Sequence, residues 1–202
     1  MVKTAMESDD DSPVQADHHI QHQFPHNVRF CGLCGGAMRM RTVLPDHKSF
    51  KVCSRCGFID FPGPKLVAGC LVIDAGRVLL LRRGIEPEIG KWTFPGGYVD
   101  LGETPQQAAL RETREEVGMQ VELSRILGVY ADPAHPIAAV VVYLAKPGIE
   151  EASVTDEATE VRYFAPPDIP WHEIAFRTTQ DALHDWLALL ESQPDRGPDS
   201  DP

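Results

Sequence analysis

The chain has 202 residues, enough for one domain of ordinary size and a small additional module, and its mean hydropathy is −0.22. No apolar run approaches the roughly 20 residues that span a membrane, so we expect no membrane association. The net charge is −11, and a phosphate-bearing substrate would therefore need metal ions to offset the repulsion from an acidic body.

Four segments follow one another along the chain. Residues 1–27 are acidic and rich in histidine and resemble neither a secretory signal nor a transit peptide, so we expect a disordered tail on a cytoplasmic protein. Residues 191–202 are also acidic, and we expect a second disordered tail there. Between the tails, residues 28–64 hold four of the five cysteines, and residues 65–190 carry the periodic apolar patterns of a larger domain.

The cysteine-rich segment contains two CxxC pairs separated by eighteen residues. This pattern is a strong signal for a zinc ribbon, in which one Zn²⁺ is bound by Cys31, Cys34, Cys53 and Cys56. Four cysteine ligands leave no position open for water, so the ion would be structural rather than catalytic. Disulfides or a redox motif are the alternatives, and the missing secretion signal and βαβ context disfavour them. Cys70 lies in an apolar run, and we expect a buried thiol.

Apolar periodicity predicts the elements of the larger domain. The predicted strands cover residues 66–74, 77–83, 92–99 (broken by a bend at 95–97), 121–131, 138–145 and 160–166. A final helix over residues 178–190 would present one apolar face, formed by Leu183, Trp186, Leu187 and Leu190. Together with the helix described next, this order predicts an α/β or α+β sandwich.

A helix over residues 104–117 carries the most informative residues. Thr104 is suited to the N-cap, Pro105 to the first helical position and Gly118 to the position where the helix ends. Its three glutamates at spacing i, i+3 and i+4 share one face, and they are Glu112, Glu115 and Glu116. Carboxylates so placed suit Mg²⁺ or Mn²⁺, although a solvated acidic face with arginine partners is the alternative.

The residues around this helix resemble the Nudix box, the signature of the Nudix hydrolase family. The pattern Gly-x5-Glu-x7-Arg-Glu-hydrophobic-x-Glu-Glu-x-Gly-hydrophobic is matched at every charged and glycine position, by Gly97, Glu103, Arg111, Glu112, Glu115, Glu116 and Gly118. Thr113 departs from the pattern, because an aliphatic residue is commoner there. The resemblance extends over the flanking strands and includes a zinc ribbon directly upstream, covering residues 30–190.

The resemblance implies a fold and a set of roles. The fold would be an α/β/α sandwich with a mixed sheet. Glu115 and Glu116 would be the main ligands of Mg²⁺ or Mn²⁺, with the carbonyl of Gly97 nearby, and Glu112 would be a further ligand or the base that activates water. Arg111 would orient the glutamates through charge-assisted hydrogen bonds. Glu103 and Gly118 would support the loop and the end of the helix.

The same resemblance implies one further carboxylate outside the box, because family members often have a catalytic carboxylate in a loop downstream of it. Glu157, just before the predicted strand at residues 160–166, matches best. A merely solvated loop is the equal alternative, since loops carry function but are also simply polar.

The substrate implied is a small nucleotide diphosphate. A ribbon followed by the box resembles both the NADH pyrophosphatases and a shorter group that acts on FAD or ADP-ribose with release of AMP. The sequence after Gly118 lacks the Ser-Gln-Pro-Trp-type motif of the NADH group, so FAD or ADP-ribose is favoured and NADH is the alternative. By analogy the family also suggests a homodimer.

Two alternatives from other classes remain open. One is a non-catalytic adaptor that uses the ribbon to bind nucleic acid or protein, with an inert Nudix fold. The intact glutamates argue against it, and the modest number of basic residues in the ribbon makes nucleic acid an unexpected partner. The other is an isomerase on the same scaffold, which the complete box disfavours.

Overall fold

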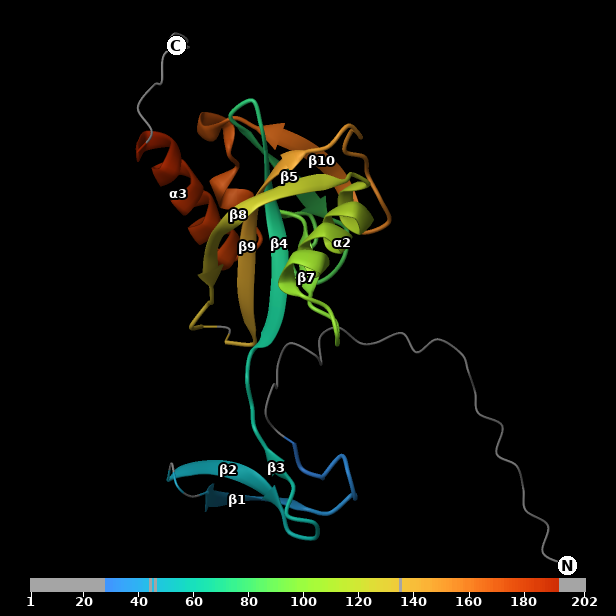
Figure 1. The fold of residues 1–202 in the computed structure, drawn as a ribbon, viewed down its shortest axis with the longest axis vertical. Coiled ribbons are helices and arrows are strands. Elements are labelled where there is room, and N and C mark those ends of the chain that lie inside the picture. Colours follow the sequence, from blue (N-terminus) through green and yellow to red (C-terminus); the bar gives the residue numbers. More distant parts are fainter. Residues whose placement is uncertain (1–27, 44, 46, 135, 193–202) are drawn as a thin grey trace, which may run out of the picture.

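The computed structural model describes residues 28–43, 45, 47–134 and 136–192. The predicted tails lie outside the described residues, except that Glu191 and Ser192 belong to the last helix. The described residues form two lobes joined by residues 61–64 (Figure 1). Within the described part of the chain, no helix has the length and apolar character needed to cross a membrane.

The smaller lobe is a three-stranded antiparallel sheet in the order β1-β2-β3. Its strands are β1 (Met38–Val43), β2 (Lys48–Cys53) and β3 (Ile59–Asp60). Among its described residues only Cys31, Gly36 and Cys53 are buried. A module of this size with so little apolar core needs another source of stability, and a bound metal is the usual one.

The larger lobe is built on a mixed sheet with the strand order β10-β5-β4-β9-β8. The central pair, β4 and β9, is parallel, and the other neighbours are antiparallel. Two short strands extend it, since β6 pairs with β5 and β7 with β4. The bounds are β4 (Lys65–Asp74), β5 (Arg77–Arg83), β6 (Trp92–Thr93), β7 (Gly96–Tyr98), β8 (Val121–Tyr130), β9 (Ala138–Pro147) and β10 (Ala158–Phe164).

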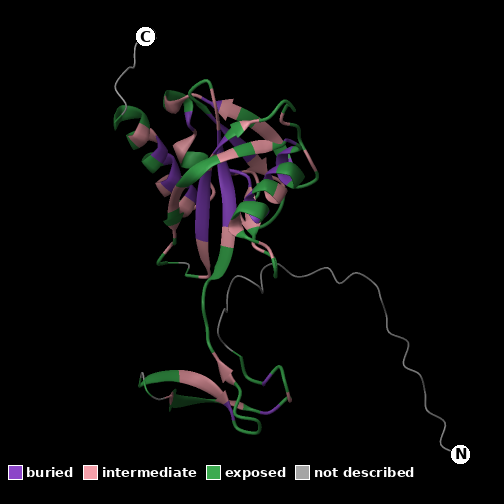
Figure 2. Cartoon of the chain, viewed as in Figure 1, coloured by how far each residue is buried: buried purple, intermediate pink, exposed green. Residues whose placement is uncertain are grey.

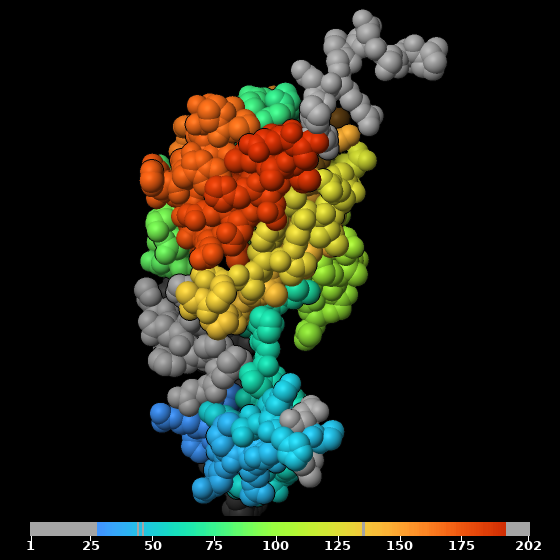
Figure 3. Space-filling model, turned by 90° about the vertical axis from the view of Figure 1, so that its left-hand side faces the viewer, coloured from blue at the N-terminus to red at the C-terminus, as the bar shows by residue number. Residues whose placement is uncertain are grey.

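Two helices cover opposite faces of this sheet, α2 (Pro105–Val117) and α3 (Arg177–Ser192). Successive side chains of β4 point to opposite faces, so Cys70 packs in the core beneath α2 and Leu71 in the core beneath α3. Figure 2 shows the buried residues concentrated in the central strands. In the space-filling view α3 lies beside β8 (Figure 3). The predicted sandwich of sheet and helices is thereby confirmed.

The predicted elements are found with small shifts. The strand expected at residues 160–166 is β10, which begins two residues earlier and gives way to the 3₁₀ turns η1 (Pro166–Asp168) and η2 (Trp171–Glu173). On the apolar face predicted for α3, Leu183, Trp186 and Leu187 pack into the core, while Leu190 lines a pocket between α3 and the sheet and is 43% exposed. Leu190 lies in the last turn of α3. Cys70 is fully buried, as expected.

Candidate functional site

Two glycines of β7 allow the close approach of backbone and side chains around the site. β7 pairs with β4 so that Gly96 faces Gly69, and a Cβ on Gly96 would lie 2.7 Å from the Cα of Gly69. A Cβ on Gly97 would lie 2.3 Å from Oε1 of Glu112. The first glycine therefore permits strand packing, and the second permits a helix carboxylate to rest directly on the backbone.

The helix α2 begins and ends where the sequence predicts. Thr104 is the N-cap, its hydroxyl accepts from the Gln107 amide at 3.3 Å, and the Gln107 side chain accepts from the Thr104 amide at 2.9 Å. Gly118 ends the helix with a φ of 68°, in the left-handed region, and its amide donates to the carbonyl of Arg114. These caps fix the rotation of the helix and hence the direction in which its glutamates point.

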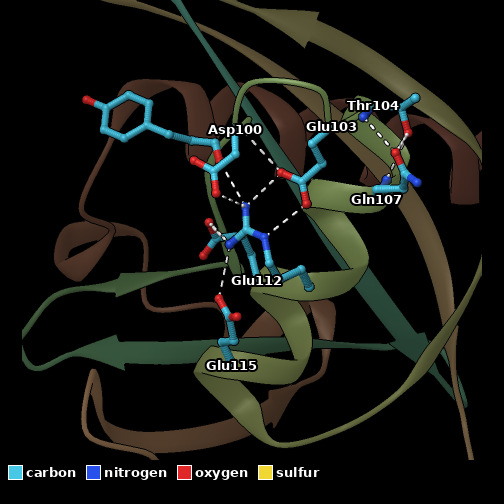
Figure 4. A network of polar contacts seen from close by, with 8 residues as sticks. Asp100, Glu103, Thr104, Gln107, Glu112 and Glu115 are labelled. Carbon is cyan, nitrogen blue, oxygen red and sulfur yellow. Dashed lines mark hydrogen bonds and ion pairs between the residues drawn. The ribbon is translucent and has the colours of Figure 1, made fainter.

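Figure 4 shows Glu103, Glu112 and Glu115 gathered in one polar network, and Arg111 is the hydrogen-bond donor that all three share. Its guanidinium binds Glu103 in a bidentate manner at 2.9 Å for each bond, and it donates to Glu112 at 2.8 Å and to Glu115 at 3.0 Å. It also donates to the carbonyl of Tyr98 at 3.0 Å. Hydrogen bonds from Arg111 lower the pKa of Glu103. The Arg111 guanidinium thus connects the loop before α2, through Glu103, to two of the three box glutamates.

Glu116 is the most buried carboxylate of the site, with 6% of its surface exposed. Its Oε2 accepts from the Gly96 amide at 2.7 Å, which orients it toward β7. Burial raises the pKa of Glu116 to about 8, although the Gly96 hydrogen bond opposes this, and the charges of Glu112 and Glu157 add to the rise. A buried carboxylate facing two others is costly without a cation.

The other two box glutamates differ in exposure. The side chain of Glu112 is 15% exposed, and burial raises its pKa despite the hydrogen bond from Arg111. The side chain of Glu115 is 59% exposed. The carboxylate oxygens of Glu112, Glu115 and Glu116 are not close enough together for all three to bind one ion in this arrangement. Among the described residues, only the four ribbon cysteines have their ligand atoms that close together.

The oxygen donors at this site fit a hard divalent cation. Glu116 contributes a buried carboxylate held by a backbone amide, and Glu112 lies against the backbone of Gly97 at a spacing that only glycine allows. Glu115 is exposed and held by a single arginine contact, so it is free to turn toward an ion. Carboxylate and carbonyl oxygens are the ligands that Mg²⁺ and Mn²⁺ prefer.

Glu157 is brought to the same region by the loop before β10. Its carbonyl accepts from the Gly84 amide at 2.8 Å, and its charge raises the pKa of both Glu112 and Glu116. The structure therefore places this downstream carboxylate within electrostatic range of the box, at the end of β5. Whether Glu157 takes part in the chemistry stays a prediction.

Arg83 is a site residue that the sequence analysis did not single out. It ends β5, its Nε donates to the carbonyl of Pro87 at 2.6 Å, and its guanidinium lies 5.1 Å from the Phe176 ring centroid. Burial lowers the pKa of Arg83, and the charges of Glu116 and Glu157 oppose that shift. The sequence offered one signal for Arg83, since two arginines, Arg82 and Arg83, end an otherwise apolar strand. Arginine is seldom buried in a protein without a partner.

Thr113, the departure from the box pattern, is fully buried. Its hydroxyl donates to the carbonyl of Ala109 at 2.7 Å, one turn earlier in α2. The polar atom is therefore satisfied within the helix, and the methyl packs against the sheet, as an aliphatic side chain would.

The four ribbon cysteines form one cluster. Their sulfurs all lie within 4.8 Å of one another, with 3.7 Å between Cys31 and Cys56 and 3.5 Å between Cys34 and Cys53. Hydrogen bonds from the amides of Cys56 and Arg55 lower the pKa of Cys53 to about 6. Thiolate is the form that binds zinc, so the backbone amides around Cys53 favour the metal-binding state of that residue.

Glycines shape both cysteine turns. Gly35 and Gly57 have φ values of 69° and 75°, as expected for residues that follow each CxxC pair. Gly36 was not singled out, yet a Cβ there would lie 2.9 Å from the sulfur of Cys53 and 2.8 Å from the Cβ of Arg55. The sequence signal for Gly36 was that two glycines in a row, Gly35 and Gly36, follow the first CxxC pair.

Comparisons with known proteins identify relatives of the larger lobe. The family model of the NUDIX domain matches residues 63–187. The chain is 30% identical over 112 residues to an ADP-ribose pyrophosphatase from Methanocaldococcus jannaschii, covering 53% of this chain and 65% of the relative. It is 31% identical over 153 residues to a NAD-capped RNA hydrolase from Photobacterium profundum, covering 70% of this chain and 54% of that protein.

A solved structure extends the similarity to most of the chain. The crystal structure of a NUDIX hydrolase from Nitrosomonas europaea is 34% identical, with a TM-score of 0.74, and the match covers 82% of this chain and 93% of that one. The match to each of the first curated relatives spans 54% to 65% of the relative's length. The chain is therefore similar to one part of each of these relatives, which includes the Nudix domain, and not to their whole length.

Proposed function

The chain belongs to the Nudix family, and from this we propose that it is a metal-dependent hydrolase that cleaves the diphosphate bond of a nucleotide joined to a second moiety. The observation that carries the proposal is the network around Arg111, which connects Glu103, Glu112 and Glu115 beside the buried Glu116. An adaptor with an inert fold would have no use for a buried Glu116 that is repelled by the charges of Glu112 and Glu157.

Mg²⁺ or Mn²⁺ would be held by Glu112, Glu115 and Glu116, with the carbonyl of Gly97 beside them. Such an ion supplies two things when bound, a lowered pKa for attacking water and neutralisation of charge on the phosphoryl oxygens. The protein's own contribution is positional. The Gly96 amide holds Glu116, and Arg111 keeps Glu112 and Glu115 on the side of α2 that faces β7.

The base that takes the proton from water is assigned to one of two carboxylates, Glu112 or Glu157. Burial raises the pKa of Glu112, which makes it a better proton acceptor than an exposed glutamate. Glu157 comes from another element, the loop between β9 and β10, and its charge raises the pKa of Glu112. Glu112→Gln and Glu157→Gln separate the two, since only loss of the base should abolish the acidic limb of the pH–rate profile.

FAD and ADP-ribose are the substrates we propose. Support comes from the relative named as an ADP-ribose pyrophosphatase and from the missing Ser-Gln-Pro-Trp-type motif. Water would form a bond to one phosphorus as the bridging P–O bond breaks, which releases AMP together with FMN or ribose 5-phosphate. NADH is the second candidate, because several relatives are named as hydrolases of NAD-capped RNA.

The proposed cellular location is based on the four ribbon cysteines. Four clustered cysteines that bind zinc must stay reduced, so we propose that the protein works in the cytoplasm as a small-molecule hydrolase. A homodimer stays a prediction, to be checked by light scattering on the purified chain.

The test is a comparison of kcat/KM for FAD, ADP-ribose and NADH at one fixed Mg²⁺ concentration, following AMP release. We expect FAD or ADP-ribose to be cleaved faster than NADH, and we expect the activity to disappear with a chelator. A preference for NADH would overturn the substrate proposal alone. Metal-independent activity, or none on any nucleotide diphosphate, would overturn the hydrolase proposal.

A further inference from the structure

The ribbon differs in charge from the rest of the chain. Residues 28–64 contain six lysines and arginines and two aspartates, a net charge of +4, and since the whole chain carries −11, the remaining residues carry −15. Strong segregation of this kind indicates a surface that attracts an anionic partner. The number of basic residues alone gives no reason to expect nucleic acid, but the strands place several of these residues together.

The strand register places three of the cations on one face of the ribbon sheet. Partners across antiparallel strands point to the same side, and Arg39 pairs with Val52, Arg41 with Phe50 and Val43 with Lys48. We call this face, with Arg39, Arg41, Lys48, Phe50 and Phe61, the basic–aromatic face. All three of its cations are exposed.

An aromatic pair lies on the same face. The rings of Phe50 and Phe61 meet edge to face with centroids 4.9 Å apart, and Phe61 is 67% exposed. Phe61 directly follows β3, next to the strand that carries Phe50. A solvent-exposed ring beside three cations is an unusual use of a large apolar side chain, because exposed aromatic surface costs free energy unless a partner covers it.

One acidic residue of the ribbon lies among the described residues, and the strand register places it away from this face. Asp60 pairs with Lys51 and therefore points to the opposite side, together with Met40. The other acidic residue of the ribbon, Asp46, is outside the described residues. The described part of the basic–aromatic face carries cations and rings without a carboxylate.

We propose that the basic–aromatic face binds single-stranded nucleic acid. Phosphates would contact Arg39, Arg41 and Lys48, and an unpaired base would stack on Phe61, which is the combination that sequence-tolerant single-strand binders use. A duplex would satisfy the cations but leave Phe61 without a base to stack on. The proposal is independent of the hydrolase proposal, because it rests on ribbon residues that are separate from the box.

The test uses the full-length protein with its zinc retained, in buffer free of Mg²⁺. Fluorescence anisotropy measures binding to a labelled twelve-nucleotide oligouridylate, its DNA counterpart and a duplex of the same length. The oligonucleotides contain no diphosphate bond, so the proposed hydrolase reaction does not interfere. We expect binding to both single strands in preference to the duplex, with a slope of log K against log salt of about −2 for three phosphate contacts.

Variants locate the surface. R39Q/R41Q should reduce the salt slope by about 1.4, and Phe61→Ala should weaken binding by about tenfold through the lost stacking. Arg125→Gln, an exposed arginine on β8, is the matched control and should bind as the wild type does. Zinc content and hydrolysis of a small nucleotide should stay unchanged in the ribbon variants, which reports that both lobes are folded.

Three results would overturn the proposal. They are R39Q/R41Q binding within twofold of the wild type, equal affinity for duplex and single strand with no effect of Phe61→Ala, and binding to phosphatidylserine vesicles without binding to either oligonucleotide. The last result would identify the surface as a site for anionic membranes.

Discussion

At the scale of single residues, Glu116 is the carboxylate whose charge matters most for the proposed activity. It is buried, and the Gly96 amide orients it, so the isosteric amide of Glu116→Gln keeps the shape and that hydrogen bond. We expect kcat to fall by at least about a thousandfold, since loss of a metal ligand removes several kcal/mol at about 1.36 kcal/mol per tenfold. The rate of ADP-ribose hydrolysis by the variant and by the wild type, measured under the same conditions, gives the size of this fall.

The control for that variant is Glu122→Gln, an exposed glutamate on β8. It should leave kcat unchanged, and both variants should keep the melting temperature of the wild type or raise it, because a buried carboxylate is replaced by a neutral group. Near-wild-type turnover in Glu116→Gln would contradict the assigned role.

Gly97 gives a second prediction at the same scale. A Cβ on Gly97 would meet the carboxylate of Glu112, the far end of a flexible side chain, so Gly97→Ala should displace that group at little cost to the fold. We expect kcat/KM to drop by at least about tenfold with a loss of unfolding free energy below about 1 kcal/mol. Gly63→Ala is the matched control, because a Cβ there meets nothing within 4 Å. Large destabilisation without loss of specific activity would refute this reading.

At the scale of elements, the N-cap of α2 determines how the box is presented. Thr104→Ala removes the hydroxyl that accepts from the Gln107 amide, and we expect the unfolding free energy to fall by about 1 kcal/mol. Urea denaturation measures the change, and Thr104→Ser should restore most of it because serine retains the acceptor. Equal stability of the alanine and threonine proteins would show that solvent caps this helix as well as Thr104 does.

At the scale of the whole molecule, the ribbon should carry one Zn²⁺ per chain. Cys31, Cys34, Cys53 and Cys56 already form a cluster of the required size, whereas Cys70 is buried beneath α2 in the other lobe. Metal analysis of protein purified without an affinity tag should give one zinc, Cys53→Ser should lower the content and Cys70→Ser should not. Absence of zinc together with four titratable thiols in the native ribbon would contradict the assignment.

The elements that the sequence predicted well are those with strong local signals. The caps at Thr104 and Gly118 and the apolar runs of the central strands act within a few residues, so they fix α2, β4 and β5 almost to their ends. The differences lie at element ends, as with β10, which begins two residues before the predicted start and ends two residues before the predicted end.

The candidate site divides in the same way. The spacing of Glu112, Glu115 and Glu116 on a helix, and of the cysteines in two tight turns, follows from local geometry and could be read directly from the chain. Arg83 could not be recognised from spacing, because its electrostatic interaction with Glu116 arises only when the fold brings the end of β5 close to that glutamate.

The sequence by itself determined which chemical groups this protein carries, two thiol pairs and a helix of glutamates, because their spacing is a property of a turn or a helix. Only the tertiary structure decided the environment of those groups. The burial of Glu116, the contact of Glu112 with Gly97 and the meeting of Arg41 with Phe50 on one face all depend on pairing between distant segments. Strand register and packing set such pairings through the summed burial of many side chains, which no short motif encodes.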